Sequence, residues 1–232
     1  MTSEPLKTLY AIYGASGFGR GVMPLARAQL QAADLESAAY ELVFIDDAES
    51  AEWVNGHRVL TFDAFVALEA TAKYVCIAIA NSQIRERLVQ KLEQHSLQHW
   101  SVWAATQIQM DDVQIGQGAV LCNHVHFSSN IRVGDFFHAN YFSYVAHDCV
   151  IGNYVTFAPS VKCNGNVHIG DHAYIGAGAM LRQGTSSRPL MIGRGAVVGM
   201  GAVVIDDVPD GATVVGNPAR IIKISRSGPS AC

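Results

Sequence analysis

A histidine followed directly by an aspartate, His147-Asp148, is the pair of side chains in this sequence best suited to moving a proton. Imidazole titrates near neutral pH and suits a general base. A neighbouring carboxylate favours the protonated ring and so makes it more basic. Adjacent residues on a straight strand point to opposite faces, so the pair can cooperate only if the chain bends there. The alternative interpretation is an exposed corner histidine without a chemical role.

The cysteines are not placed as nucleophiles. Cys149 lies two residues after His147, but its position in the repeat described below points it into the interior, as expected for a buried structural thiol. The chain has 5 cysteines, an odd number, and none forms a CxxC pair. We therefore expect reduced thiols and a cytoplasmic protein, and not a disulfide framework.

A glycine-containing loop near the N-terminus could bind phosphate groups. Leu9–Tyr13 predicts a strand, Gly14–Gly19 a loop, and residues 21–33 a helix. Backbone amides of such a loop, together with the positive end of the helix, can hold phosphates. The spacing GxxGxG differs from the dinucleotide pattern GxGxxG, so no nicotinamide cofactor is expected. The alternative is a tight turn without a ligand.

Two further strands end in polar residues. Glu41–Ile45 predicts a strand that ends at Asp46-Asp47, where an acidic side chain can bind a ribose or a base. Tyr74–Ile79 predicts another strand, and either residue of Asn81-Ser82 can cap the helix that follows, to about residue 95. Strand, glycine turn, helix and strand in this order predict a parallel α/β sheet.

From about Val113 the pattern becomes a six-residue repeat. The first residue of each six is apolar at consecutive positions: Ile115, Leu121, Phe127, Val133, Ala139, Val145, Ile151, Phe157, Cys163, Ile169, Ile175 and Leu181. The fifth is small or β-branched, except at Phe137: Ala119, Val125, Ile131, Ser143, Cys149, Val155, Val161, Val167, Ala173, Ala179 and Thr185. Glycine often follows the first position: Gly116, Gly134, Gly152, Gly170 and Gly176.

Such a repeat predicts triangular coils, each made of three short faces. Stacked coils lie about 4.8 Å apart, and each coil satisfies the backbone polar groups of the one before. Glycine, Asn and Asp allow the positive φ values of tight corners. The register slips between Leu181 and Ile192, which predicts an insertion of five residues around Ser186 to Leu190. The repeat then resumes at Ile192, Val198 and Val204.

These motifs resemble a known family. The repeat is similar to the left-handed β-helix acyltransferases, an exception to the usual right-handed crossover, and Asp206–Gly211 with Val215–Arg220 resembles their common ending. Tyr13–Gly17, Phe44–Asp47 and Ala146–Gly152 together resemble the sugar acetyltransferases related to sialic-acid O-acetyltransferase and to the bacillosamine and perosamine N-acetyltransferases.

The resemblance covers about residues 6–224 and completes the predicted fold class. We expect an α/β N-terminal domain with a small Rossmann-like parallel sheet over residues 1–105. A left-handed parallel β-helix is expected over residues 106–224, followed by a disordered tail over residues 225–232.

The resemblance implies acetyl transfer from acetyl-CoA to the amino group of a nucleotide-linked 4-amino-4,6-dideoxy sugar, for example a UDP-4-amino sugar, in glycan biosynthesis. His147 aligns with the family's general base and Asp148 with its acidic partner. The base would remove the ammonium proton, so that the amine attacks the thioester directly. By the same resemblance, the nucleotide sugar would be held by Ser16, Gly17, Phe18, Asp46, Asp47, Ala80, Asn81 and Asn140.

Thr156, Ala177 and Met200 would lie along the acetyl-CoA groove by alignment. A relative carries a histidine at the position of Thr156, so the sequence departs from the family there, although a threonine hydroxyl can donate one hydrogen bond. The insertion after Thr185 would lie at the rim of the same groove. The resemblance also implies a homotrimer with the acetyl-CoA site between subunits.

Composition excludes some partners. The formal net charge is −4 without a basic run, which gives no electrostatic reason for nucleic-acid binding. No run of eighteen apolar residues predicts a membrane span, and Met1–Lys7 carries no apolar signal core. No metal is expected.

Three alternatives stay open. The first is O-acetylation of sialic acid or a related sugar. The second is a zinc enzyme of the γ-carbonic anhydrase type, whose ligands come partly from neighbouring subunits. Histidines do lie in the repeats, but no two are eighteen residues apart: His124, His126, His138, His147, His168 and His172. The third is a non-enzymatic assembly scaffold.

Overall fold

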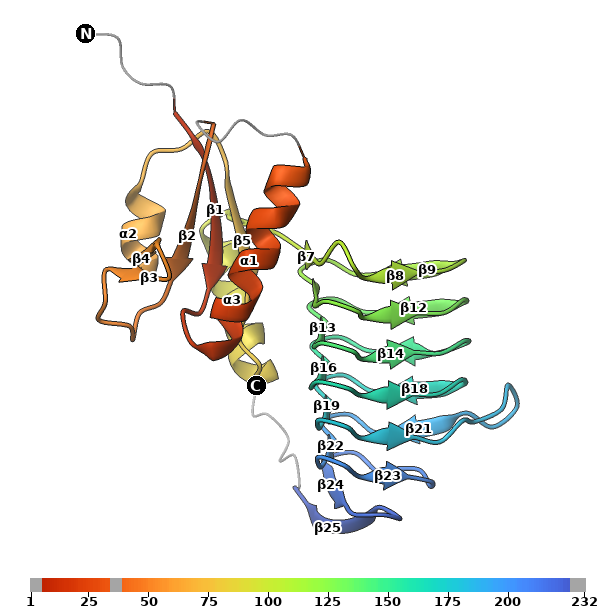
Figure 1. Ribbon diagram of the computed structural model, residues 1–232. Helices are drawn as coiled ribbons and strands as arrows, with labels where there is room; N and C mark the ends of the chain where they lie inside the picture. Colours follow the sequence, from red (N-terminus) through yellow and green to blue (C-terminus); the bar gives the residue numbers. More distant parts are fainter. Residues whose placement is uncertain (1–5, 34–38, 226–232) are drawn as a thin grey trace, which may run out of the picture. The chain divides into compact units, whose positions relative to one another are not determined.

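The computed structural model describes residues 6–33 and 39–225 (Figure 1). Backbone contacts divide the chain into two compact units, Met1–Ala105 and Thr106–Cys232. Of the tail expected to be disordered, only Ser225 belongs to the described residues, and the rest lies outside them.

The first unit is built on one mixed sheet with strand order β3-β4-β2-β1-β5-β6. All its strand pairs are parallel except β3 with β4. The strands are β1 (Thr8–Tyr13), β2 (Tyr40–Ile45), β3 (Trp53–Val54), β4 (His57–Leu60), β5 (Lys73–Ile77) and β6 (Gln98–His99). The helices are α1 (Gly17–Ala32), α2 (Phe62–Ala67) and α3 (Ser82–Gln94), and β7 (Val102–Trp103) follows β6.

Local sequence explains most of these elements. The apolar strands β1, β2 and β5 are predicted, and α3 begins as expected because the Asn81 side chain accepts a hydrogen bond from the Ile84 amide at 2.9 Å. The sequence interpretation missed α2, which Thr61 caps, and the β3–β4 hairpin. Asn55-Gly56 supplies the positive φ values of that hairpin turn, so this dipeptide was an available signal.

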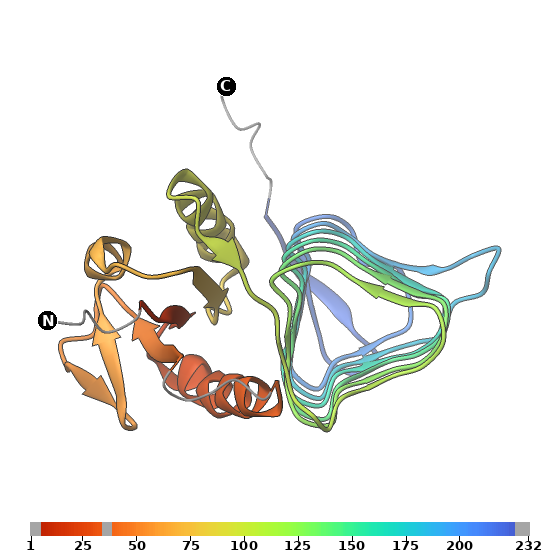
Figure 2. The same cartoon turned by 90° about the horizontal axis from the view of Figure 1, so that it is seen from above.

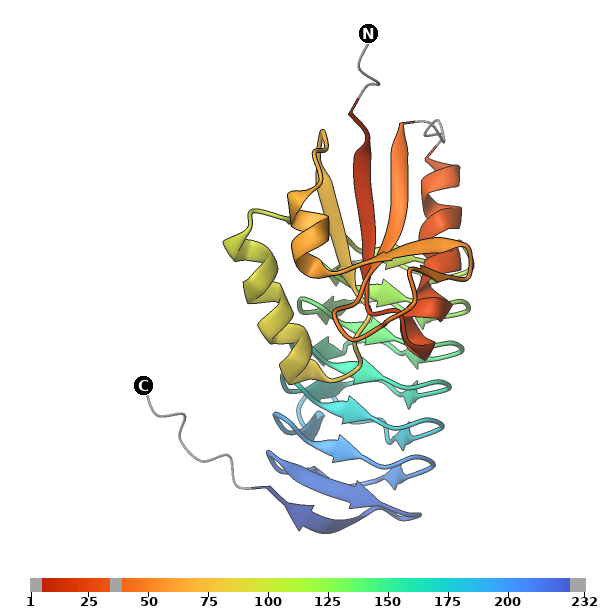
Figure 3. The same ribbon diagram turned by 90° about the vertical axis from the view of Figure 1, so that its left-hand side faces the viewer.

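The second unit is a parallel β-helix whose coils stack one on another (Figure 3), with a triangular outline along the axis (Figure 2). Paired strands are eighteen residues apart, as in Ala139 with Phe157 and Val145 with Cys163. One face carries β10 (Val120–Leu121), β13 (His138–Ala139), β16 (Thr156–Phe157), β19 (Tyr174–Ile175), β22 (Val197–Val198), β24 (Ala212–Val215) and the antiparallel β25 (Arg220–Ile224).

The other two faces have the same construction. The second face carries β8 (Ile108–Gln109), β11 (His126–Phe127), β14 (Tyr144–Val145), β17 (Lys162–Cys163), β20 (Met180–Leu181) and β23 (Val203–Val204). The third face carries β9 (Val113–Ile115), β12 (Ile131–Val133), β15 (Val150–Ile151), β18 (Val167–Ile169) and β21 (Leu190–Ile192).

The core of the β-helix is the column of first and fifth residues, as the repeat predicts. Phe137, the exception at a fifth position, is fully buried between two other rings. It meets Phe127 and Phe157 edge-to-face at centroid distances of 6.2 and 5.2 Å. The large side chain therefore adds aromatic contacts to the core and does not disturb the repeat.

The recurrent glycines have a different role from the one predicted. The left-handed corner positions are mostly not glycine: Asp112, His124, Asn130, Phe136, Phe142, Asp148, Tyr154, Ser160, Asn166 and His172. Gly134 has no positive φ, but a Cβ there would collide with Asn153 of the next coil. The Asn153 side chain accepts the Asp135 amide at 2.8 Å, so glycine is needed for close approach.

The insertion is shifted by one residue from the prediction. Leu190 pairs with Val167 inside β21, so the inserted residues are 185–189. They form a loop that projects from the β-helix (Figure 1), closed by reciprocal backbone hydrogen bonds between Thr185 and Arg188. The loop leaves the stack after Gly184, whose amide donates to Gly165 of the previous coil at 2.9 Å.

Candidate functional site

The His147-Asp148 pair lies at a corner of the β-helix, between β14 and β15. Asp148 adopts the left-handed conformation with φ 58°, and this bend turns its carboxylate toward the preceding side chain. His147 Nδ1 and Asp148 Oδ2 lie 2.7 Å apart. The bend that cooperation requires is therefore present.

Asp148 is held by the preceding coil as well. Its Oδ1 accepts a hydrogen bond from Asn130 Nδ2 at 3.2 Å, and its amide donates to Ser129 O at 3.1 Å. Hydrogen bonds from His147 and, to a lesser extent, Asn130 lower the pKa of the Asp148 carboxyl below its ordinary value. The carboxylate is thus kept charged and aimed at the imidazole.

The His147 ring is half-exposed, with 45% of its side chain accessible. When the ring is neutral and its Nδ1–H donates to Asp148, Nε2 carries the lone pair that can accept a proton. A base with one nitrogen oriented and the other accessible is what proton removal from an amine requires. Cys149, in contrast, is fully buried, as predicted, and its thiol lies 3.2 Å from Asn164 O.

The effect of the Asn130 hydrogen bond on the pKa of Asp148 can be measured. In Asn130→Ala, the pKa of Asp148 should rise toward the ordinary carboxyl value, because one of the donors that stabilise the charged form is lost. A ¹³C NMR titration of the carboxyl carbon measures it. Because folding lowers this pKa, the interaction stabilises the fold above the ordinary carboxyl pKa, and the contribution is lost as pH falls through the lowered value.

The matched control for this titration is Asn166→Ala. Asn166 occupies the same left-handed corner two coils after Asn130, with φ 56°. Both variants therefore place alanine in the same backbone conformation, but only one removes a donor to Asp148. An unchanged Asp148 pKa in Asn130→Ala, or an equal rise in the two variants, would contradict the assignment.

The glycine loop of the first unit is a tight turn that exposes the start of α1. Gly14 has φ 111°, and a Cβ on Gly19 would collide with the Gly14 carbonyl oxygen. Around Gly17 there is open space, and Ser16 makes no side-chain cap hydrogen bond. Phe18 lies in this first turn of α1, and the turn has no acidic residue that would repel a phosphate.

The carboxylates of Asp46 and Asp47 both accept hydrogen bonds from other groups of the protein. Asp46 accepts the amides of Ala15, Ala48 and Glu49 at 2.8, 2.9 and 3.2 Å. Its carboxylate therefore ties the glycine loop to the end of β2.

Asp47 accepts the Phe62 amide and the Tyr13 hydroxyl, each at 2.8 Å, and Lys91 Nζ lies 3.5 Å away. Partial burial raises the pKa of the Asp47 carboxyl, but these donors outweigh it and leave the pKa below its ordinary value.

Ala80 and Asn81 lie in the loop between β5 and α3, and a buried arginine supports this loop. Arg85 is fully buried and donates to Ile79 O at 2.7 Å and to Ala80 O at 3.3 Å. The Asn81 side chain is occupied as the cap of α3. The sequence interpretation missed Arg85, since an arginine on a polar helix gives no sign of burial in the sequence.

The remaining predicted residues lie away from His147 within one chain. Asn140, Ala177 and Met200 follow β13, β19 and β22, at the corner before the second face, whereas His147 follows that face. Met200 is 82% exposed, and Thr156 is buried in β16. Within one chain, these residues therefore lie at another corner or on another face of the β-helix than His147.

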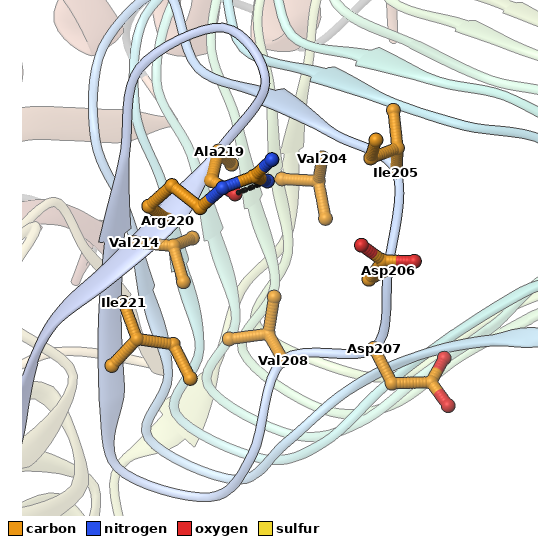
Figure 4. Close-up of a pocket in the computed structure, with 9 residues that line it drawn as sticks. All are labelled: Val204, Ile205, Asp206, Asp207, Val208, Val214, Ala219, Arg220 and Ile221. Carbon is orange, nitrogen blue, oxygen red and sulfur yellow. Dashed lines mark hydrogen bonds between the residues drawn. The ribbon is translucent and has the colours of Figure 1, made fainter.

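Asn140 also has a structural contact, since its Nδ2 donates to Phe157 O at 3.0 Å. A cavity of about 330 Å³ lies farther along the axis and contains none of the predicted site residues (Figure 4). It is lined by Val204, Ile205, Asp206, Asp207, Val208, Val214, Ala219, Arg220 and Ile221. Val204, Val208 and Val214 also belong to the hydrophobic core, so this cavity borders the core near the last strands of the β-helix.

Among residues 6–33 and 39–225, no three His, Cys, Asp or Glu side chains gather in a way that could hold a metal ion. No helix in the described part of the chain is long and apolar enough to cross a membrane.

Comparisons with known proteins agree with this architecture. The family profile described as the PglD N-terminal domain matches residues 10–92. The GDP-perosamine N-acetyltransferase of Escherichia coli O157:H7 is 46% identical over 217 residues, which cover 94% of this chain and 97% of that protein. The structure of WeeI from Acinetobacter baumannii AYE is 54% identical with a TM-score of 0.89, over 93% of this chain and 100% of that one.

A third similar structure contains ligands. It is a variant of the perosamine N-acetyltransferase from Caulobacter crescentus in complex with CoA and GDP-perosamine. It is 25% identical with a TM-score of 0.79, over 92% of this chain and 96% of that one. The comparisons confirm the predicted fold class, an α/β unit followed by a left-handed parallel β-helix. The chain belongs to the hexapeptide-repeat family of acetyl-CoA-dependent N-acetyltransferases that act on nucleotide-linked amino sugars.

Proposed function

We propose that this enzyme acetylates the 4-amino group of a GDP-linked 4-amino-4,6-dideoxy sugar, with His147 as the general base. The observation that carries the proposal is the 2.7 Å contact between His147 Nδ1 and Asp148 Oδ2 at an exposed corner of the β-helix. Guanosine is favoured over uridine because the E. coli relative is a GDP-perosamine N-acetyltransferase.

In the proposed mechanism, the amine nitrogen attacks the carbonyl carbon of the acetyl thioester. His147 Nε2 takes the proton that the nitrogen loses, while Asp148 stabilises the imidazolium through Nδ1. The tetrahedral intermediate then collapses, the carbon–sulfur bond breaks, and the CoA thiolate takes the proton back from His147. Backbone amides are the expected donors to the oxyanion. No covalent acyl-enzyme is needed.

The proposal includes a homotrimer whose sites lie between subunits. Its support is the separation within one chain between the corner of His147 and the corner of Asn140, Ala177 and Met200. A neighbouring copy could bring its corner with Asn140, Ala177 and Met200 to the corner of this chain that carries His147. Light scattering on the purified protein tests the stoichiometry, and a monomeric mass at full activity would contradict it.

In this proposal the N-terminal loop binds the nucleotide. The support is the exposed start of α1 at Ser16 and Gly17, the lack of an acidic residue in its first turn, and the space around Gly17. Asp46, Asp47, Ala80 and Asn81 would shape this site through the contacts described above, and the first two could still reach a ribose. The proposed location is the cytoplasm, in keeping with the four free thiols among the described residues, at Cys76, Cys122, Cys149 and Cys163.

The substrate assignment is tested by incubating the purified enzyme and acetyl-CoA with candidate acceptors and measuring CoA release. The panel contains GDP-4-amino and UDP-4-amino sugars, their 4-hydroxy counterparts and free sialic acid. We expect turnover on the GDP-4-amino sugar. Turnover on the UDP-linked amino sugar alone would change only the assigned nucleotide, from guanosine to uridine, and would leave N-acetylation standing. Turnover limited to hydroxyl acceptors would overturn N-acetylation in favour of the O-acetyltransferase alternative.

A further inference from the structure

Gly165 lies directly beneath the imidazole of His147, on the next coil of the β-helix. A Cβ built on Gly165 would lie 2.5 Å from both Cε1 and Nε2 of His147 and 3.0 Å from Cδ2. Nonbonded carbon atoms prefer about 3.5–4.0 Å. Any side chain at residue 165 would therefore displace the ring from its present position.

The backbone gives no other reason for glycine here. Gly165 does not have the positive φ that Gly178 has at 68°. The equivalent places in other coils carry side chains, at Asp111, Ser129 and Gln183. Gly165 is also buried, although it lies at a corner. The imidazole above it is the neighbour that a side chain would strike.

We infer that Gly165 is a positioning residue for His147. The pair is supported by the coils on both sides: Asn130 of the preceding coil holds Asp148, and the bare backbone at Gly165 accommodates the ring. This support fixes the direction of Nδ1 toward Asp148 and of Nε2 toward its proton. The inference rests on the proposed function, in which His147 is the base.

Gly165→Ala should lower the rate strongly while it leaves the stability of the fold nearly unchanged. The ring would have to move by about 1 Å to reach van der Waals distance, and the 2.7 Å contact with Asp148 would not survive in its present geometry. Because the ring is half-exposed, it can turn into solvent at little expense in stability. A displacement of about 1 Å can lower a rate roughly a hundredfold.

The experiment compares the wild type, Gly165→Ala and Gln183→Ala, which changes the equivalent place one coil after Gly165. We expect kcat to fall about a hundredfold in Gly165→Ala, with KM for both substrates and Tm nearly unchanged, and no loss in Gln183→Ala. In ¹⁵N NMR spectra of the imidazole, Gly165→Ala should lose the signature of an Nδ1–H bonded to a carboxylate. Wild-type kcat with an unchanged ring spectrum would overturn the inference.

The double variant His147→Ala/Gly165→Ala separates positioning from folding. Once the ring is absent, the added methyl group should have no further effect, so the double variant should match His147→Ala in activity and Tm. If Gly165→Ala fails to fold, the double variant should fold, because the clash is gone. A misfolded double variant would make the glycine structural and overturn the inference. If His147→Ala keeps full activity, the proposed function fails, and the NMR comparison still decides the positioning.

Discussion

Replacing His147 with glutamine should lower kcat by roughly 10²- to 10⁴-fold, the usual contribution of a positioned general base. Glutamine fills a similar volume and can still donate to Asp148, but its amide cannot take a proton near neutral pH. KM for the sugar and for acetyl-CoA should stay within about threefold if the ring acts mainly in the transition state. Steady-state kinetics with both substrates varied measures this effect.

The matched control is His168→Gln. His168 lies on β18, and the proposed mechanism does not use it. We expect wild-type kcat for this control and an unchanged Tm for both variants, because neither ring belongs to the hydrophobic core. A His147→Gln enzyme that keeps more than a tenth of wild-type kcat would refute the assigned role.

Replacing Asp46 with asparagine should destabilise the first unit by about 2–3 kcal/mol, because charge-assisted hydrogen bonds to three backbone amides are weakened. The amide group also presents an NH₂ where an acceptor is needed. Since Asp46 ties the loop at Ala15 to the end of β2, we expect KM for the nucleotide sugar to rise at least tenfold while KM for acetyl-CoA stays constant. Denaturant unfolding and steady-state kinetics measure the two effects.

This variant also separates two roles for the carboxylate. A direct contact with ribose predicts a higher KM with unchanged stability, whereas bracing of the loop predicts both changes together. Asp63→Asn is the control, because Asp63 lies in the first turn of α2 and outside the proposed site. A raised KM with full stability would show that the main-chain contacts of Asp46 matter less than a ligand contact.

Sequence reasoning succeeded where one short-range rule decides the structure. The six-residue repeat places inward side chains without reference to distant residues, so the core of the β-helix could be predicted nearly completely. The bend at Asp148 could be predicted only as a requirement of chemistry, since aromatic residues such as Phe142 and Tyr154 take the same left-handed conformation at other corners. Composition at a corner therefore says little about its φ.

The residues that hold His147 and Asp148 in place could not be predicted from the sequence, for a different reason. Asn130 lies eighteen residues before Asp148, and Gly165 lies eighteen after His147, so the register already put them in neighbouring coils. What the register does not reveal is the side-chain direction, which sends Asp148 back toward one coil and His147 forward across the next. For Asp46, a carboxylate at a strand end can bind a ribose or backbone amides, and the sequence does not reveal the three amides that the fold brings to it.

Because His147 and Asp148 depend on three consecutive coils, their chemistry depends on local unfolding of the β-helix. Stacked repeats are stabilised by their nearest neighbours, so opening begins at the ends and reaches the middle last. The coil of His147 has coils beyond both of those that support it, as the pairing from β8 through β23 shows. The proton-transfer geometry thus lies where amide hydrogen exchange should be slowest, and fraying at either end would leave it undisturbed.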